Sequence, residues 1–255
     1  EGREIRKAFV PRDQGWVLLA ADYSQVELRI LAHISEDSGL KEAFNRGQDI
    51  HTQTAAEVFE VDCEEVTPNL RRHAKVINFG IAYGMSAYGL ARDLDIPRKE
   101  AEEYIDRYFE RFSGVKEYMD QIIEQARDNN YVTTIFNRRR YLPQINSRNY
   151  HRRQFAERAA INTPIQGSAA DIMKIAMINF YRALRKSEYS GRLLLQVHDE
   201  LVLETPKTEL EGIAGLLKTE MEQAVDLSVP LPVDLQVGDN WCNKRDFSLE
   251  GEKGD

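Results

Sequence analysis

The sequence contains little cysteine and no long apolar run, and each absence excludes a class of protein. Only two cysteines occur, Cys63 and Cys242, which lie far apart and have no histidine cluster beside them. This usage indicates neither a disulfide framework nor a zinc site, so both are predicted to be reduced thiols. No segment approaches the roughly 18 consecutive apolar residues of a membrane helix, and no charged-then-apolar leader opens the sequence. We therefore expect a cytoplasmic protein with no membrane partner.

An overall positive charge is also lacking. The formal net charge is −8 over 255 residues, of which 42% are hydrophobic. This composition supports one large core or two small ones and argues against a uniformly basic nucleic-acid binder. Positive charge is instead concentrated locally: residues 138–158 carry seven arginines and one acid, and Arg71–Lys75 (RRHAK) form a second basic cluster. Such patches, rather than the average charge, decide whether a chain can bind nucleic acid.

The order of the expected helices and strands predicts an α+β fold. Apolar runs and hairpin patterns indicate strands within residues 16–21, 131–141 (with a turn near Asn137), 193–204 and 233–237. Helical periodicity is expected in residues 39–130, with breaks at Pro68, Pro97 and 113–114, and again in 153–184 and 208–225. Pro164 leaves open whether residues 153–184 form one helix or two. Strands near both ends, with helices between them, predict an antiparallel sheet backed by helices and a mostly helical inserted subdomain.

Two acidic positions interrupt or end apolar strands. Asp22 follows WVLLAA, and Asp199-Glu200 interrupts LLLQVHDELVLE. If these strands are neighbours, Asp22 and Asp199 converge at one sheet edge, where two carboxylates repel unless a cation neutralises them or they share a proton. Carboxylate oxygens suit Mg²⁺, and two such ions can stabilise the attacking and leaving oxygens of a phosphoryl displacement. The alternative is that Asp199-Glu200 is an ordinary polar turn.

The segment RRHAKVINFGIAYG places two cations and two aromatic rings on one side of a predicted helix. Arg71, Lys75, Phe79 and Tyr83 recur every four residues and so fall within a sector of about 120°. Such a face can hold a polyphosphate at one end and stack a flat base at the other. The alternative is an amphipathic helix in which the rings belong to the core and the cations are solvated.

Two further patterns also have two interpretations. Arg158, Asn162 and Gln166 recur every four residues and could donate to minor-groove acceptors, or could form a solvated helix face. Ser24-Gln25-Val26-Glu27 fits the capping box S-x-x-E, in which Glu27 bonds back to the main chain at the start of a helix. The residues alone leave both questions open.

Three ordered motifs together resemble those of family A DNA polymerases, and the bacterial type most closely. They are DYSQVELR at 22–29, RRHAKVINFGIAYG at 71–84 and QVHDE at 196–200, and the similarity extends from residue 1 to about 241. This combination is specific and favours a functional role for each pattern over its alternative. It implies template-directed addition of deoxynucleotides to a primer 3′-hydroxyl, with release of pyrophosphate and with two Mg²⁺ ions as cofactors.

The resemblance also implies roles for individual positions. Catalysis would involve Asp22, Asp199, Glu200 and Lys75. The metal ligands would be Asp22, Asp199 and the carbonyl group of Tyr23. Contacts with the deoxynucleotide are implied for Tyr23, Gln25, Glu27, His51, Arg71, Lys75, Phe79 and Tyr83, and Glu27 would exclude a ribose 2′-hydroxyl. Contacts with primer-template DNA are implied for Arg158, Asn162, Gln166 and His198.

A palm and a fingers subdomain follow from the same resemblance. Residues 1–40 and 146–255 would form the palm, and residues 41–145 the fingers. No thumb or exonuclease region is recognisable, so we expect a fragment that is weak or inactive without an N-terminal thumb and exonuclease portion. Two alternatives to a polymerase are a two-metal nuclease, which would use the same carboxylates, and a catalytically inactive nucleic-acid-binding module.

Overall fold

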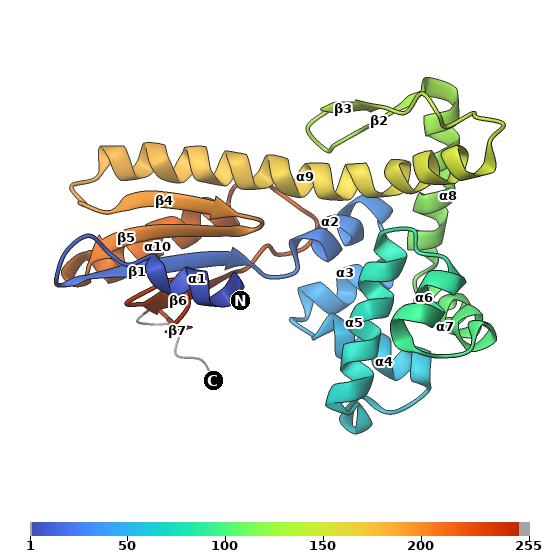
Figure 1. Cartoon of the computed structure of the whole chain (residues 1–255), viewed down its shortest axis with the longest axis horizontal. Coiled ribbons are helices and arrows are strands. Elements are labelled where there is room, and N and C mark those ends of the chain that lie inside the picture. The colour runs from blue at the N-terminus through green and yellow to red at the C-terminus, as the bar shows by residue number, and fades with distance from the viewer. Residues whose placement is uncertain (1, 250–255) are drawn as a thin grey trace. The chain divides into compact units, whose positions relative to one another are not determined.

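The structure is a computed structural model that describes residues 2–249 and contains two compact units (Figure 1). The first consists of the described residues of Glu1–Val26, Ala169–Asp226 and Leu231–Asp255, and the second of Glu27–Ser168 and Leu227–Pro230. The first contains a five-stranded sheet, and the second is mostly helical. The predicted α+β class is therefore confirmed. No helix within residues 2–249 is both long enough and apolar enough to cross a bilayer.

The sheet of the first unit has the strand order β4-β5-β1-β6-β7, and each neighbouring pair is antiparallel. Its strands are β1 (Trp16–Tyr23), β4 (Arg192–Val197), β5 (Glu200–Pro206), β6 (Val233–Gly238) and β7 (Lys244–Asp246). Strand β1 lies in the middle, which explains its apolar run, because residues 17–21 are all buried. The register places Asp22 opposite Glu200. The sequence did not predict β7.

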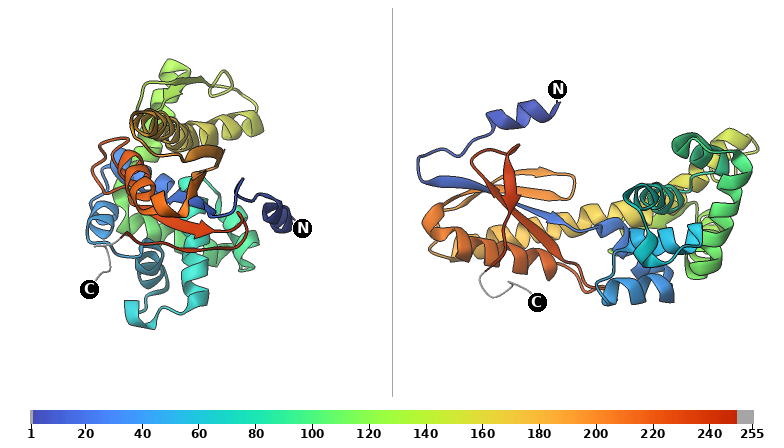
Figure 2. Two further views of the ribbon diagram at one scale, coloured as in Figure 1. Left: turned by 90° about the vertical axis from the view of Figure 1, so that its left-hand side faces the viewer. Right: turned by 90° about the horizontal axis from the view of Figure 1, so that it is seen from below.

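Side chains of β1 alternate between the two faces of the sheet. Leu18 and Ala20 lie on one face and form a buried cluster with Trp241. Helix α10 (Leu210–Glu222) also packs against the sheet (Figure 2). The hydroxyl of Tyr23 donates to a carbonyl oxygen of this helix at 2.7 Å. Because Asp22 alternates in step with Leu18 and Ala20, it belongs to the face that carries Trp241.

The second unit consists of helices and a short hairpin. Its elements are α2 (Val26–Ser35, apart from Val26), α3 (Ser38–Asn45), α4 (Ile50–Phe59), α5 (Pro68–Ala82), α6 (Ala87–Leu94), α7 (Arg98–Arg111), α8 (Ser113–Asn129), β2 (Tyr131–Thr133) and β3 (Arg139–Tyr141). The predicted breaks are confirmed: Pro68 is the first residue of α5, and Pro97 directly precedes α7. Proline suits a helix start because the N–H group there has no intrahelical partner. The predicted turn near Asn137 is also found, with Asn137 at φ 62°.

One continuous helix, α9 (Tyr150–Lys186), forms where the sequence allowed either one helix or two. It is 37 residues long and passes through Pro164. Proline takes one main-chain donor out of the helical ladder. Beside it, the hydroxyl of Thr163 donates to the carbonyl oxygen of Ala159 at 2.6 Å. The helix therefore continues across a residue that often ends one.

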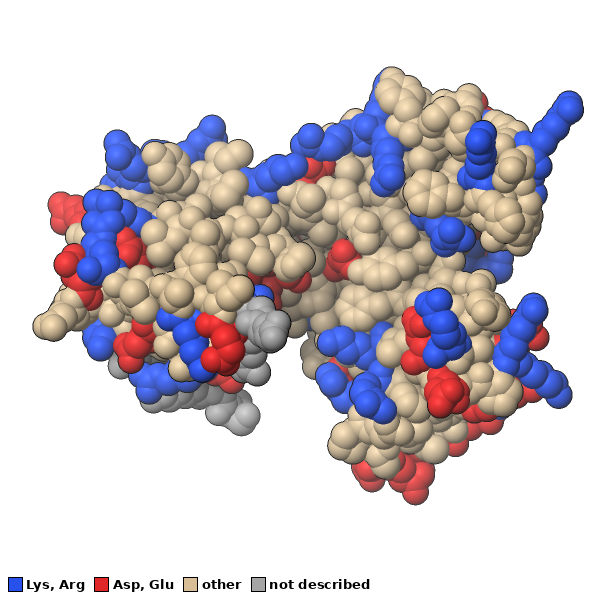
Figure 3. Space-filling view, viewed as in Figure 1, with Lys and Arg blue, Asp and Glu red and all other residues tan. Residues whose placement is uncertain are grey.

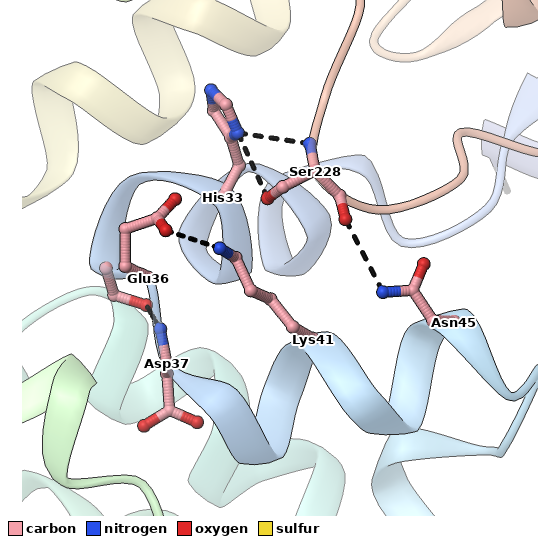
Figure 4. A network of polar contacts seen from close by, with 7 residues as sticks. His33, Glu36, Asp37, Lys41, Asn45 and Ser228 are labelled. Carbon is pink, nitrogen blue, oxygen red and sulfur yellow. Dashed lines mark hydrogen bonds and ion pairs between the residues drawn. The ribbon is translucent and has the colours of Figure 1, made fainter.

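The short segment Leu227–Pro230 belongs to the second unit, although the residues on both sides of it belong to the first. Polar contacts hold it against α2 and α3 (Figure 4). The main-chain N–H of Ser228 donates to Nδ1 of His33 at 3.2 Å, and the side-chain amide of Asn45 donates to the carbonyl oxygen of Ser228 at 3.5 Å. At the end of the segment, Arg29 donates to the carbonyl oxygen of Pro230 at 2.8 Å. These bonds fix a connecting loop to the helical unit.

Candidate active site

Asp22 and Asp199 lie on or beside neighbouring strands of the first unit. Asp22 is the penultimate residue of β1, and Asp199 lies in the two-residue turn between β4 and β5. His198, the first residue of this turn, has φ 55°, which allows a tight reversal of the chain. The main-chain N–H of Tyr23 donates to the carbonyl oxygen of Asp199 at 3.2 Å. The turn is thereby fixed against the end of β1, and the expected convergence of the two strands is found.

Negative charge accumulates around Asp22. Partial burial, followed by the charges of Asp199, Glu200 and Asp234, raises the pKa of the Asp22 carboxyl group to about 6, whereas Lys244 acts in the opposite direction. A cation bound at this position would relieve the repulsion between the carboxylates. The charge arrangement of the first unit therefore favours cation binding.

The carboxylate of Glu200, next to the two aspartates, has two interaction partners. One of its carboxylate oxygens forms an ion pair with Nζ of Lys244, and the other accepts a hydrogen bond from Nε1 of Trp241 at 2.9 Å. The side chains of Glu200 and Lys244 are only 12% and 11% exposed. These partners could not be predicted, because no local pattern links residues 241 and 244 to a turn about 40 residues earlier. Both oxygens of Glu200 are thus already engaged.

Few potential metal ligands lie near Asp22 among the described residues. An open pocket is lined by Asp22, Asp199 and Glu200, and also by His198. Within residues 2–249, no three His, Cys, Asp or Glu side chains are grouped so that they could enclose a metal ion. Two carboxylates and a main-chain carbonyl nevertheless suit Mg²⁺, because this ion keeps several waters and commonly binds substrate phosphates. The donor chemistry therefore fits the predicted ion better than it fits a structural metal.

Helix α5 carries the predicted row of cations and rings in the second unit. Arg71 and Lys75 are exposed, and the half-buried rings of Phe79 and Tyr83 have centroids 6.1 Å apart. Tyr83 caps the C-terminus of α5 rather than lying inside it. Gly84 follows at φ 66°, and a Cβ atom there would lie 3.1 Å from the side chain of a residue on α9. Neither ring belongs to the buried core, in contrast to the amphipathic-helix alternative.

Arg71 has an acidic partner that no sequence pattern indicates. Its Nε and Nη2 atoms donate to the carboxylate of Asp49 at 2.5 and 3.1 Å. The hydroxyl of Thr52 donates to the same carboxylate at 2.6 Å, and Asp49 also caps α4. Burial alone would raise the pKa of Asp49, but the bonds from Arg71 and Thr52 outweigh it and lower this pKa to about 2. Asp49 therefore stays ionised and orients the Arg71 guanidinium.

His51, for which the resemblance implies a contact with the triphosphate, is buried in the second unit. The residue is 2% exposed; its Nδ1 atom lies 3.1 Å from the amide nitrogen of Asn78, and its ring contacts Phe79 at 5.9 Å between centroids. Burial lowers the pKa of His51 to about 4, with Asp49 opposing the shift and Arg71 and Lys75 adding to it. A neutral, covered ring supports Phe79 instead of presenting charge to a ligand.

Glu27 contacts Tyr83, because the Tyr83 hydroxyl donates a hydrogen bond to the Glu27 carboxylate. In the predicted capping box, the side chain of Glu27 would bond to the main-chain N–H of Ser24. Helix α2 begins at Val26, two residues after Ser24, and Gln25 between them has φ 55°. The main-chain N–H of Ser24 instead donates to a carbonyl oxygen before β6, so the strand-like pairing continues past β1. Glu27 is therefore directed to the aromatic residue that follows α5.

The predicted row on α9 is only partly exposed. Arg158 and Gln166 are exposed, whereas Asn162 between them is half-buried. The Oδ1 atom of Asn162 is buried and has no hydrogen-bond partner among the described residues. Arg158 and Gln166 are thus the members of the row that solvent can reach.

Comparison with known proteins identifies the family of this chain. The model of DNA polymerase family A matches residues 1–243. The chain belongs to DNA polymerase family A. Its family A relatives include DNA polymerase I of Bacillus caldotenax, 60% identical over 245 residues, and that of Bacillus subtilis (strain 168), 56% identical over 245 residues. Each comparison covers 96% of this chain and 28% of the relative, so the chain spans less than a third of the length of these proteins.

A solved structure has the same fold as this family A chain. The POL domain of Pol1 from M. smegmatis, in a complex with DNA primer-template and dNTP, matches with a TM-score of 0.91 and 49% identity. The match covers 94% of this chain and 42% of the other. The resemblance to family A DNA polymerases that the three motifs indicated is therefore confirmed.

Proposed function

We propose that the protein carrying this chain is a DNA-directed DNA polymerase, which adds deoxynucleotides to a primer 3′-hydroxyl and releases pyrophosphate. The observation that carries this proposal is the position of Asp22 on β1 beside the β4–β5 turn of Asp199, linked through Tyr23, in a family A chain. The M. smegmatis protein with the same fold holds DNA primer-template and dNTP. Such a transfer depends mainly on positioning the reactants and on neutralising charge. Rigidly held acidic and basic side chains provide both.

In the first unit, we assign metal binding to Asp22, Asp199 and the carbonyl group of Tyr23. Two bound Mg²⁺ ions would stabilise the charge on the attacking and leaving oxygens. The sheet holds Asp22, and the bond from Tyr23 holds the turn of Asp199, so both donors sit on rigid elements. His198, at the same turn, is proposed to contact the primer end.

In the second unit, we assign deoxynucleotide binding to the row on α5. Arg71 and Lys75 would contact the triphosphate, and Lys75 would also neutralise the departing pyrophosphate. Phe79 and Tyr83 would pack against the nascent base pair, with His51 acting indirectly as the support of Phe79. Tyr23, Gln25 and Glu27 are proposed to contact the nucleotide as well, and Glu27 to exclude a 2′-hydroxyl.

We further propose that the first unit is the palm and the second the fingers. The limits predicted from the motifs lie after residues 40 and 145, whereas packing divides the chain after residues 26 and 168 and encloses Leu227–Pro230 in the second unit. Arg158, Asn162 and Gln166 would contact the minor groove of the primer-template. Such contacts test the shape of a base pair without reading its sequence, because minor-groove acceptors occur at every pair.

Incubation with a labelled primer-template, four deoxynucleotides and Mg²⁺ tests this proposal against the nuclease alternative. The enzyme at the full length of its relatives should lengthen the primer. Shortening of the primer would support a two-metal nuclease, and binding without either reaction would support an inactive binding module. We expect the chain of residues 1–255 alone to extend the primer weakly, and vigorous extension by it would contradict that expectation.

Phe79→Tyr is expected to increase the use of dideoxynucleotides relative to deoxynucleotides about tenfold. A dideoxynucleotide lacks its 3′-hydroxyl, and a phenolic hydroxyl at this half-buried ring could replace the lost hydrogen bond, worth about 1 kcal/mol or more. The measurement is the ratio of kcat/KM for the two substrates. Phe155→Tyr, on an exposed ring of α9, is the matched control. Equal discrimination in wild type and Phe79→Tyr would refute the assignment.

Glu27→Ala is expected to raise ribonucleotide incorporation roughly tenfold or more, because a small side chain admits the 2′-hydroxyl that the carboxylate excludes. The measurement is the ratio of kcat/KM for ribo- and deoxynucleotides. Tyr83→Phe is informative beside it, since it removes the hydrogen bond to Glu27 and keeps the carboxylate. If both variants lose discrimination equally, the bond rather than the carboxylate sets sugar selection.

Manganese affinity is expected to fall as the pH drops below 6. The metal-free Asp22 carboxyl has a pKa of about 6, so protons compete with the metal below that value and not above it. One competing proton predicts a loss of about tenfold per pH unit below 6. Electron paramagnetic resonance of free Mn²⁺ between pH 5 and 8 measures this. An affinity that stays constant down to pH 5 would exclude Asp22 as a ligand.

A further inference from the structure

Glu200 is held by residues from the C-terminal part of the first unit. Lys244, the first residue of β7, pairs with one carboxylate oxygen, and the indole N–H of Trp241 donates to the other at 2.9 Å. Trp241 is itself fixed, because its main-chain N–H donates to the carbonyl oxygen of Phe9 at 3.1 Å and its ring meets that of Phe9 edge-on at 5.4 Å. Arg6 lies over the same indole at 4.5 Å. Trp241, which contacts Glu200, is therefore itself held in place by other residues of the first unit.

The position of Glu200 connects this network to the two aspartates. Glu200 follows Asp199 in the chain and lies opposite Asp22 in the β1–β5 register. A nearly buried ion pair is expensive to break, because the remaining charge loses its partner without regaining water. A metal bound to Glu200 would have to share a carboxylate oxygen with Lys244 or with Trp241, and its positive charge would lie close to that of Lys244. Among the described charged groups that shift the pKa of Asp22, Lys244 is the positively charged one, and it lowers this pKa.

We propose that Lys244 and Trp241 hold Glu200 as a fixed, charge-balanced support for the turn that carries Asp199, so that Glu200 positions the aspartates and does not bind metal. This inference rests on the proposed metal-binding role of Asp22 and Asp199. Lys244 is the first residue beyond the segment that the family model matches. The catalytic role implied for Glu200 becomes a positioning role.

Charge changes give this proposal a measurable signature in Mn²⁺ binding. The measurement is the Mn²⁺ affinity of the full-length enzyme without DNA or nucleotide, by electron paramagnetic resonance. Glu200→Gln removes a negative charge near the ion and should weaken binding roughly three- to tenfold. Lys244→Met removes a positive charge and should strengthen binding by a similar factor. The double variant restores the charge balance and should return to within about twofold of wild type, because nearby charges act on the ion jointly.

A metal ligand at Glu200 predicts a different pattern. The double variant would then bind Mn²⁺ as weakly as Glu200→Gln does, because a lost ligand is not replaced by removing a lysine. That result, or an unchanged affinity in Lys244→Met, would overturn the proposal. Trp241→Phe adds a test without any change of charge: it removes the indole N–H bond to Glu200, and is expected to lower kcat several-fold while leaving Mn²⁺ affinity unchanged.

Three controls separate positioning from misfolding and from failure of the proposed function. Lys207→Met removes an exposed lysine of the same unit and should leave Mn²⁺ affinity as in wild type at physiological salt. Lys244→Arg keeps the charge and should keep wild-type affinity; weakened binding in this variant, with an unchanged thermal midpoint, would count against charge balance. Asp199→Ala should weaken Mn²⁺ binding strongly. If it does not, the proposed metal site is wrong, whatever the double variant shows.

Discussion

Asp199→Ala should lower primer extension by on the order of a thousandfold or more, because it removes a charged group that stabilises the transition state. Binding of primer-template DNA should remain within about threefold of wild type, since one carboxylate does not attract phosphates. The measurements are single-turnover extension with Mg²⁺ and DNA affinity in the same buffer. The fold should survive as well, because the carbonyl oxygen of Asp199, not its side chain, accepts the bond from Tyr23.

Asp239→Ala is the matched control for this experiment. Asp239 belongs to the same unit, its side chain is 86% exposed, and it lies 4.0 Å from Lys207 in a weak surface pair. This variant should extend primers at the wild-type rate. Near-normal turnover in Asp199→Ala would remove the metal role of that residue, and a matching loss in Asp239→Ala would point to a general effect of charge.

Arg71→Ala should weaken deoxynucleotide binding by about 10- to 100-fold, the worth of a charge-assisted hydrogen bond to phosphate. The effect should appear in KM or in the ground-state Kd for the nucleotide, while DNA affinity stays unchanged. The fold should lose little, because the pair with Asp49 is partly exposed and Asp49 keeps its bond to Thr52. Pre-steady-state titration with a single deoxynucleotide measures the change.

Arg72→Ala separates this role from that of any basic residue on α5. Arg72 is also exposed and donates to Asn69 at 2.7 Å rather than to an acid. The two variants carry the same change of charge on the same helix. Equal losses of nucleotide affinity would show that only the overall charge of α5 matters, and would argue against a specific contact from Arg71.

Elements with a strong local pattern could be predicted from the sequence. The run WVLLAA became β1, the polar break in LLLQVHDELVLE became a two-residue turn with Glu200 as the first residue of β5, and Pro68 and Pro97 marked helix starts. That β1 pairs with β5 was a condition of the expected convergence of Asp22 and Asp199 and was not predicted, because no local pattern says which strands are neighbours.

Contacts between residues remote in sequence could not be predicted in this way. Glu200 meets Lys244 across 44 residues, and Arg71 meets Asp49 across 22. Neither pair recurs at a helical or strand period, so the sequence contains no signal that joins them. The burial of His51 was missed for a related reason: its partner Asn78 lies on another helix, and a polar side chain gives no warning that it will be covered.

The antiparallel register of β1 limits how this family can change length during evolution. Side chains along a strand alternate between faces, so inserting or deleting one residue between Trp16 and Asp22 would reverse the face of every residue beyond it. Asp22 would then be carried away from the Trp241 face and from its place opposite Glu200. Loops at the surface carry no such alternation of faces. Length variants among related chains are therefore expected to gather in the loops and to spare this short strand.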